Sequence, residues 1–324
     1  MKKITQTILT GKRIYVGLED SKRSWKICIR NDEKIVFEGS FDTEYSLLRS
    51  FFKNRFPRCI IKVIYEAGFQ GFWLHDLFTA DGIECIVTPP NFVTNEKNSM
   101  VKNDKIDAQR LAKNLANNDY KVCRVPSSTR RSDRQISRLL FQVQRKITST
   151  KNQIRKFFDL HHIPVLKAHA WYEHHYKGLR MLKLEDSLQF CLDTQLDILD
   201  LLREKKALLL KKLKNLCKSP KYHKNAVLLQ SVPGIGWLTA IRLVLEWGDV
   251  RDFKNGRAFA RYNGLAISQH QTGERDKRGH ITKQGNRFAR SWLVESSWTA
   301  IRGDGILLQK YNAVKKNSGQ ANKV

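Results

Sequence analysis

The spacing of hydrophobic positions in the first part of the chain predicts an α/β domain. Apolar residues alternate with polar ones from 13 to 30, which is typical of a β-hairpin. Apolar side chains recur at helical spacing from Glu44 to Phe56, and that run stops at Pro57. The predicted strands cover 13–30, 34–41, 59–65 and 83–87, and the predicted helices cover 44–56, 72–78 and a segment that begins near 104. This order predicts a mixed sheet that is covered by helices.

From Ser127 to about Ser219 the pattern changes to that of long helices. Glycine nearly vanishes, with only Gly178 remaining, and charged residues alternate with leucine and isoleucine. We expect two long helices, joined through residues 161–183, that pair as an antiparallel coiled coil. Gln195 and Lys206 interrupt the apolar seam, so a helical bundle fits nearly as well. The predicted seam consists of Ile136, Leu139, Leu140, Val143, Ile147 and Ile154 in the first helix and of Leu188, Leu192, Leu199, Leu202 and Leu209 in the second.

Two glycine-containing segments follow these helices. Residues 231–240 have the form of a hairpin between two helices, in which Gly234 and Gly236 let the backbone approach a phosphate. A purely structural tight turn is the alternative. The second segment is the most basic of the chain and fits a loop pressed against phosphates, or else a merely flexible surface loop. Its candidate nucleic-acid-binding residues are Arg275, Lys277, Arg278, Lys283, Arg287 and Arg290, and they are spaced by Gly273, Gly279 and Gly285.

The charge of the chain indicates a polyanionic partner. Lys and Arg number 59 against 31 Asp and Glu, so the formal net charge is +28, and nucleic acid is the commonest polyanion that explains such an excess. A membrane surface is the rival, but no apolar run approaches the roughly 20 residues of a spanning helix. We expect a soluble, cytoplasmic bacterial protein that is nucleoid-associated when bound to DNA. The six cysteines are widely scattered, which speaks against a zinc site and a disulfide framework.

The first long predicted helix carries many cations. They could follow a phosphate backbone, or they could form an ordinary solvated helix face, and the sequence leaves both possibilities open. These residues are Arg130, Arg131, Arg134, Arg138, Arg145, Lys146, Lys151 and Arg155.

Carboxylates recur where predicted strands end and where the helix near 104 begins. Glu66 ends an apolar strand, Glu19 ends the first strand, and Asp104 and Asp107 share one face of the helix. Clustered carboxylates repel unless divalent cations neutralise them, and two cations can stabilise both oxygens of a phosphodiester displacement. The alternative is that these acids only cap strands and solvate a helix. The polar residues 91–101 predict a loop, which either approaches the metal site or is a plain surface loop.

These acidic segments resemble the three motifs of the DEDD insertion-sequence transposases, a family that includes bridge-RNA-guided recombinases and Piv-type DNA invertases. The matching residues are Tyr15-Val16-Gly17-Leu18-Glu19-Asp20-Ser21-Lys22, Tyr65-Glu66-Ala67-Gly68 and Lys102-Asn103-Asp104-Lys105-Ile106-Asp107-Ala108. A second match lies downstream, at Ser231-Val232-Pro233-Gly234-Ile235-Gly236 and Gly279-His280-Ile281-Thr282-Lys283-Gln284-Gly285-Asn286. The resemblance covers both ends of the chain in the same order.

The resemblance implies an organisation and a set of partners. It implies a RuvC-like catalytic domain of the ribonuclease H fold at 1–126, followed by a helical coiled-coil arm at 127–222. A mostly α-helical transposase domain at 223–314 would contain a helix-hairpin-helix-like motif and the basic loop, and a polar tail would cover 315–324. It further implies Mg²⁺ or Mn²⁺ held by Glu19, Glu66, Asp104 and Asp107. The implied partners are double-stranded DNA, a structured guide RNA and further copies of the chain, in a homodimer or homotetramer.

The chain departs from the family first at the strand-end acid, which is normally an aspartate. The aligned residue is Glu19, and Asp20 stands beside it. Magnesium requires near-ideal octahedral geometry at about 2.0–2.1 Å, so one extra methylene matters. Alternation along the strand favours Glu19, because it falls on the face opposite Val16 and Leu18.

The second departure concerns the family's serine, which is the proposed nucleophile. Depending on how the basic segment is aligned, this serine falls on Thr272 or on Gln271. A threonine hydroxyl has the right chemistry but is bulkier and stiffer at χ1. If Gln271 is the true match, the nucleophile is missing.

We therefore predict a transposase or site-specific DNA recombinase of an insertion sequence. Its catalytic residues would be Glu19, Glu66, Asp104, Asp107 and Thr272. One rival is a Holliday-junction resolvase-like or other metal-dependent nuclease, which would use the acids alone. Another is a decayed or domesticated family member that binds DNA or RNA without cutting.

Overall fold

The computed structural model describes residues 11–90, 103–164, 171–272 and 275–318. The chain divides into two compact units, Met1–Val125 and Pro126–Val324. The predicted loop at 91–101 lies outside the described residues.

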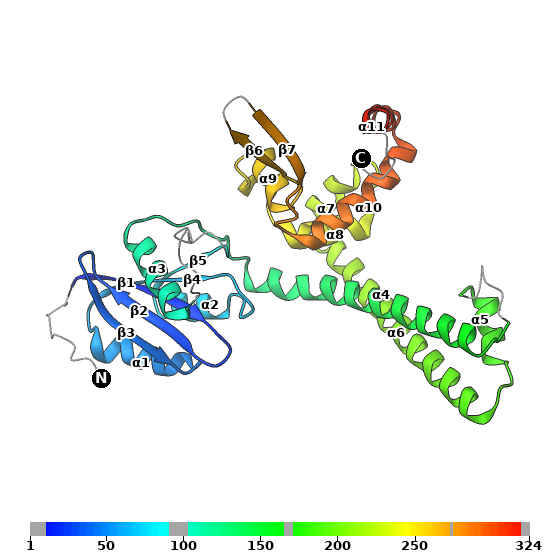
Figure 1. Cartoon of the computed structure of the whole chain (residues 1–324), viewed down its shortest axis with the longest axis horizontal. Coiled ribbons are helices and arrows are strands. Elements are labelled where there is room, and N and C mark those ends of the chain that lie inside the picture. Colours follow the sequence, from blue (N-terminus) through cyan, green and yellow to red (C-terminus); the bar gives the residue numbers. More distant parts are fainter. Residues whose placement is uncertain (1–10, 91–102, 165–170, 273–274, 319–324) are drawn as a thin grey trace. The chain divides into compact units, whose positions relative to one another are not determined.

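The first unit is built on a mixed sheet of order β3-β2-β1-β4-β5 (Figure 1). Strand β1 pairs antiparallel with β2 and parallel with β4, β2 pairs antiparallel with β3, and β4 pairs parallel with β5. The strands are β1 (Arg13–Asp20), β2 (Trp25–Arg30), β3 (Ile35–Phe41), β4 (Ile60–Glu66) and β5 (Glu84–Thr88). The predicted mixed sheet is confirmed.

Helices cover both faces of this sheet. On one face, α1 (Tyr45–Arg55) and α2 (Trp73–Ala80) pack over Val16 and Leu18 in a core that includes Phe52 and Phe78. On the other face, α3 (Asp104–Ala116) packs over Tyr15 through Leu111 and Leu115. The alternation of side chains along β1 therefore divides the strand between two separate hydrophobic layers.

Helix α3 lies against β1 at Gly17. A Cβ atom at this position would lie 2.1 Å from the carbonyl oxygen of Ala108 and 2.4 Å from the amide nitrogen of Ala112. Ordinary contacts between heavy atoms are about 3.5–4.0 Å, and backbone atoms cannot swing away as a flexible side chain does. The absence of a side chain at Gly17 therefore sets how closely α3 can approach the sheet.

The second unit is mostly helical. Figure 1 shows α4 and α6 side by side and running in opposite directions, with α5 in the connection between them. The elements are α4 (Ser128–Leu160), α5 (Glu173–Arg180), α6 (Asp186–Lys218), α7 (His223–Gln230), α8 (Trp237–Trp247), a 3₁₀ turn (Val250–Asp252), α9 (Gly256–Tyr262), β6 (Ile267–Thr272), β7 (Arg275–Ile281), α10 (Arg287–Gly303) and α11 (Gly305–Ser318).

Two hydrophobic cores stabilise this unit. One lies where α4 and α6 meet α5, and it includes Ile154, Tyr176 and Leu196. The other joins α4 and α6 to the carboxy-terminal helices, through residues such as Leu140 and Trp292. Of the predicted seam, Leu140, Val143, Ile154, Leu192 and Leu199 are buried. A coiled-coil geometry of this helix pair stays a prediction.

Two sequence predictions in this unit are wrong in detail. Leu139 is 48% exposed, because its neighbour Leu140 takes the packed position and consecutive helical residues point in different directions. The first part of the basic segment is strand β7 rather than a loop, since Thr272 pairs with Arg275 and only two residues separate the strands, which suits a hairpin. The polar segment expected from Lys315 continues α11 as far as Ser318.

Candidate active site and nucleic-acid interface

Two of the predicted catalytic acids are neighbours on one face of the sheet. Leu18 of β1 is in register with Tyr65 of β4, so the next residue on each parallel strand is an acid, Glu19 and Glu66. Residues alternate between faces along a strand. Glu19 therefore shares the face of Tyr15 and Gly17, and Glu66 shares the face of Ile64, which packs in the same layer as Tyr15. Both acids lie on the face that α3 covers.

The other two predicted acids begin α3. Leu111 and Leu115 pack with Tyr15, and Ala108 lies at Gly17, so the first turn of α3 points toward the end of β1 that carries Glu19. The side chain of Asn103 caps the helix by accepting a 3.0 Å hydrogen bond from the amide of Lys105. Asp104 and Asp107 stand in this first turn, where the helix dipole favours negative charge.

The structure ties α3 to the sheet by polar contacts as well. The Lys105 ammonium lies 3.0 Å from the Glu38 carboxylate on β3, and Gln109 donates a hydrogen bond to the same carboxylate. Asp107 forms an ion pair at 3.3 Å with Arg110 of the same helix, so this pair does not connect α3 to the sheet. The beginning of α3 is therefore fixed by packing at Gly17 and by the contacts of Lys105 and Gln109 with Glu38.

Electrostatics connect the acids. The pKa of Glu19 is raised to about 7, first by burial and then by the negative charges of Glu66, Asp107, Asp20 and Asp104, in that order. Burial is the main cause of the raised pKa, and repulsion from the neighbouring carboxylates is the second. A cation bound there would relieve the repulsion.

The donor chemistry fits a hard divalent cation, since carboxylate oxygens are the ligands that Mg²⁺ and Mn²⁺ prefer. However, the described residues contain no group of three or more His, Cys, Asp and Glu side chains placed closely enough to hold a metal ion. The four acids are therefore not arranged to coordinate one ion together, and they would have to move closer to one another when a metal binds.

Asp20 lies on the face of the sheet opposite to Glu19. It is two residues after Leu18 on β1, so both are on the face that α1 and α2 cover. Burial and the charge of Glu66 together raise its pKa to about 6, although a backbone hydrogen bond opposes the shift. Its Oδ2 atom is buried with no hydrogen-bond partner among the described residues. This geometry favours Glu19 as the first acid.

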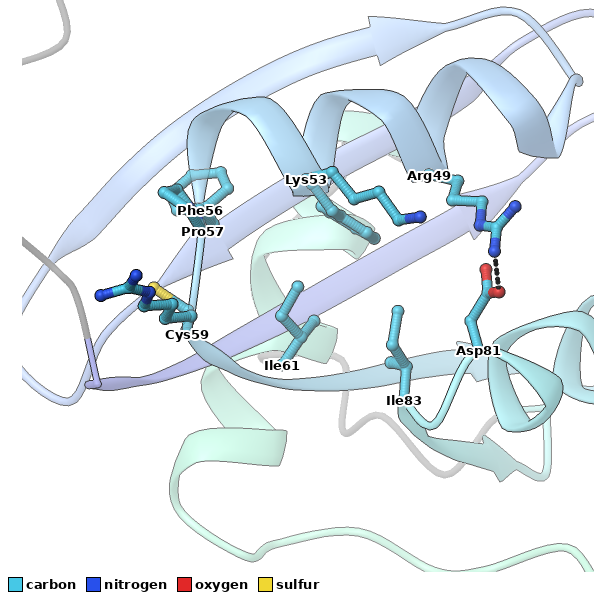
Figure 2. A pocket seen from close by; sticks show the side chains of 10 residues that line it. Arg49, Lys53, Phe56, Pro57, Cys59, Ile61, Asp81 and Ile83 are labelled. Carbon is cyan, nitrogen blue, oxygen red and sulfur yellow. Dashed lines mark ion pairs between the residues drawn. The ribbon is translucent and has the colours of Figure 1, made fainter.

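A pocket lies on this opposite face as well. It opens between α1 and the segments that lead into β4 and β5, and at one end Arg49 of α1 forms an ion pair of 2.6 Å with Asp81, which follows α2 (Figure 2). Phe52 and Ile61, which line it, belong to the layer under α1. The pocket is therefore separated by the sheet from the candidate active site.

Thr272 and Gln271, the two candidates for the nucleophile position, belong to the second unit, whereas the four acids belong to the first. Thr272 is the last residue of β6 and pairs with Arg275 of β7, while Gln271 pairs with Asp276. Arg275, Lys277 and Arg278 all lie on β7. The backbone pairing thus places these three basic residues on β7, the strand that lies beside β6 and its last residue, Thr272.

The remaining predicted cations have different surroundings. Lys283 and Arg287 are exposed. Arg290 instead donates hydrogen bonds from Nη1 to the carbonyl oxygens of Lys283 at 3.1 Å and Asn263 at 3.3 Å. Arg290 therefore holds the backbone of this segment, which reduces its availability to a phosphate.

The two hairpin glycines also differ. Helices α7 and α8 flank the turn that contains them. Gly234 has φ 81°, and a Cβ there would lie 2.3 Å from the carbonyl oxygen of Ser296 on α10. Gly234 therefore serves a tight turn packed against a helix, which was the structural alternative. Gly236 is the N-cap of α8 and has open space around its Cα.

Sequence reasoning missed a buried carboxylate, Glu246 on α8. Its side chain is fully buried and accepts hydrogen bonds from Arg138 at 2.8 and 2.9 Å and from Asn286 at 2.8 Å. Arg134 lies 3.8 Å away with its side chain only 11% exposed. These two arginines are therefore neither on a solvated face nor free to follow a phosphate backbone. The only hint in the sequence is an acid inside the apolar run of α8.

A mixed sheet of order 3-2-1-4-5 with helices on both faces is the architecture of ribonuclease H-like enzymes, and its strand-end acids fit that class. Comparison with known families agrees. Residues 16–163 match the model of a DEDD-type IS110 transposase domain, and residues 226–312 match the Transposase IS116/IS110/IS902 family. The chain belongs to this family of insertion-sequence transposases.

Individual relatives support the same placement. A protein of Sinorhizobium fredii that carries a transposase name, y4qE, is 26% identical over 89% of this chain and 72% of its own length. The transposase for insertion sequence element IS1533 of Leptospira borgpetersenii is 24% identical over 76% of this chain and 73% of its own length. The transposase for IS1111A of Coxiella burnetii is 32% identical, but over only 23% of this chain. None of the described helices is long and apolar enough to cross a membrane.

Proposed function

We propose that this chain is the recombinase of an insertion sequence and that it cleaves and exchanges strands of double-stranded DNA with the help of Mg²⁺ or Mn²⁺. The observation that carries the proposal is the placement of Glu19 and Glu66 side by side on the sheet face to which α3 brings Asp104 and Asp107. Bound there, a divalent cation would act as a Lewis acid on a phosphodiester oxygen.

The residues of the chain have distinct roles in this proposal. The four acids hold the metal, and Gly17 together with the Lys105–Glu38 ion pair positions Asp104 and Asp107 against the strand ends. Thr272 supplies the hydroxyl nucleophile. As its Oγ–P bond forms, a P–O bond of the DNA breaks, and the threonine proton passes to solvent or to a base. The departing DNA oxygen keeps the electron pair of the broken bond and takes up a proton from solvent, which makes it the hydroxyl group of the released end.

The resemblance to the family supports a proposal for the wider assembly. A structured RNA would guide the choice of DNA, and the acids of one unit would meet Thr272 in an oligomer. The helix pair at 127–222 would act as a coiled-coil arm between a catalytic domain at 1–126 and a carboxy-terminal domain at 223–314. The protein would work in the bacterial cytoplasm, on the nucleoid.

Asp104→Ala should abolish Mg²⁺-dependent DNA cleavage and leave DNA binding nearly intact. The loss should exceed the roughly 10–100-fold typical of a group that only supports a metal ligand. Glu19→Gln should have a similarly large effect. The matched control is Asp20→Asn, which changes the neighbouring acid on the other face and should leave metal dependence unaltered.

The measurement is cleavage of labelled DNA over a range of Mg²⁺ and Mn²⁺ concentrations, with Mn²⁺ binding as an independent readout. Undiminished cleavage by Asp104→Ala would exclude the metal-site assignment. A loss in Asp20→Asn but not in Glu19→Gln would move the first acid to Asp20.

A second candidate function is favoured by one observation, which is that the four acids do not lie close enough together to hold a metal ion. A decayed or domesticated family member would keep the basic surfaces and bind DNA or RNA without cutting. A Holliday-junction resolvase-like nuclease would need the four acids but no hydroxyl nucleophile. The Thr272 variants described in the Discussion separate these possibilities.

The proposed oligomer has structural support on α6. Phe190, Leu201 and Leu208 are 72%, 52% and 53% exposed and lie 11 and 7 residues apart, so they form one stripe. This stripe is on the side away from Leu192 and Leu199, which are buried against the rest of the unit. All acidic residues of α6 precede Lys205, and most of its basic residues follow it. Two antiparallel copies of α6 would therefore place the acidic half of each helix beside the basic half of the other. We propose a second copy of the chain as the partner of this stripe.

Leu201→Lys combined with Leu208→Lys should shift the assembly toward monomer, because two buried cations would face each other across the contact. Sedimentation velocity at several protein concentrations measures the change. Leu160→Lys is the control, since Leu160 is 79% exposed at the end of α4 and outside the stripe. An unchanged oligomeric state in the double variant would contradict the proposed contact.

A further inference from the structure

A cluster of cations surrounds one aromatic residue in the helix pair. On α4, the Lys151 Nζ and the Arg155 Cζ lie 5.1 Å and 5.7 Å from the centroid of the Trp171 ring. These two residues are one helical turn apart and therefore approach the ring from the same face of α4. Their positions define the first half of the cluster.

Helix α6 supplies the second half. The Arg203 Cζ lies 4.0 Å from the centroid of the Tyr176 ring, and its Nη2 donates a hydrogen bond of 3.5 Å to the carbonyl oxygen of Trp171. Burial lowers the pKa of Lys151, and repulsion from Arg203, Lys206 and Arg155 lowers it further. Four cations thus converge from two helices.

Negative charge in the described part of the chain does not balance this cluster. Asp200 forms an ion pair with Arg203 at 3.4 Å, but the same carboxylate is held at 2.7 Å by Arg180. Lys151 and Lys206 form no ion pair with a described residue. In addition, the Trp171 Nε1–H is buried and has no acceptor among the described residues. The protein therefore holds together like charges and an unpaired donor, which is unfavourable unless an anion joins them.

We propose that Lys151, Arg155, Arg203, Lys206 and the Trp171 ring form a binding site for phosphate groups of a nucleic-acid backbone. One phosphate oxygen atom could accept from the indole N–H while neighbouring oxygens face two or more cations, which gives charge-assisted hydrogen bonds. The choice of nucleic acid as the occupant rests on the proposed function and on the net charge of +28.

This site differs from the rest of the basic face of α4. Arg134 and Arg138 are already paired with Glu246 inside the unit. Lys151 and Arg155 lie farther along the helix, where no described carboxylate meets them. In the sequence, these cations look like one continuous basic stripe. The contacts divide the stripe into arginines that bind Glu246 inside the unit and the pair Lys151 and Arg155, which can contact phosphates.

The test compares the variants Lys151→Gln and Lys206→Gln with the control Lys156→Gln. Lys156 is an exposed lysine of α4 that lies outside the cluster. Affinity for duplex DNA and for a structured RNA is measured by fluorescence anisotropy over a range of salt, in the absence of divalent metal. Each cluster variant should weaken binding about three- to tenfold and reduce the log–log salt slope on duplex DNA by about 0.9. The Lys156 variant should do neither.

Thermal unfolding of the free protein separates a binding role from a structural one. Lys206→Gln removes a repelled cation that forms no ion pair with a described residue, so the Tm should stay unchanged or rise, whereas Lys151→Gln also loses the contact with the Trp171 ring. A fall in Tm with an unchanged salt slope would identify the cluster as structural and would overturn the proposal. An unchanged slope in both cluster variants, with either nucleic acid, would overturn it as well. Because no metal is present, the result does not depend on cleavage, so a chain that binds without cutting still tests this site.

Discussion

Gly17→Ala should remove most of the metal-dependent cleavage although residue 17 touches neither metal nor DNA in our proposal. The new methyl group would lie 2.1 Å from a backbone oxygen of α3, so the helix must move away from β1 by roughly 1 Å or more to restore normal contact. This movement displaces Asp104 and Asp107 from Glu19 and Glu66. A misplacement of about 1 Å at a reacting centre can cost on the order of 100-fold in rate.

The same substitution should destabilise the first unit by about 1–3 kcal/mol, the usual cost of inserting a group into a packed layer. Denaturant unfolding and DNA cleavage should therefore both be measured. Gly178→Ala is the control, since Gly178 lies in helix α5 with no atom within 4 Å of the added Cβ, and it should be neutral or slightly stabilising. Wild-type cleavage by a folded Gly17→Ala protein would show that the position of α3 is irrelevant to the reaction.

The hydrophobic pattern was a good guide where burial itself sets the pattern. The strands alternate or run apolar because they are packed on one or both faces, so their order and even the face of Glu19 follow from the sequence. Gly17 is different. It reads as an ordinary strand residue, and only the approach of α3, which is distant in sequence, explains why a side chain is excluded there.

The charged residues were harder to interpret because charge alone does not identify a partner. Arg134 and Arg138 have the spacing of a phosphate-binding face, but a single buried carboxylate from α8, more than a hundred residues later, binds them instead. Strand β7 was also unpredictable from periodicity, since its sequence contains only one large apolar residue, Ile281. Its pairing with β6 comes from the short connection rather than from a buried face.

Thr272→Val should eliminate any covalent protein–DNA adduct. Valine has nearly the same shape and suits a β-strand, so the hairpin of β6 and β7 should persist while the hydroxyl is lost. Removing a true nucleophile should lower adduct formation by at least about 10³-fold. Thr272→Ser keeps the hydroxyl with less bulk and should retain or increase the adduct. Gln271→Ala is the matched control, because it alters the neighbouring residue without touching the hydroxyl.

The same assay decides whether the natural protein is active. The adduct is detected on a denaturing gel with labelled DNA, and mass spectrometry locates the modified residue. Glu19→Asp should improve activity independently of Thr272→Ser, because metal geometry and nucleophile identity are separate contributions to the barrier. An adduct that survives Thr272→Val would exclude Thr272 as the nucleophile. An adduct that forms only when both substitutions are combined would mean that the natural chain binds DNA without cutting it, since Glu19 and Thr272 would then each block a step that the family's usual residues permit.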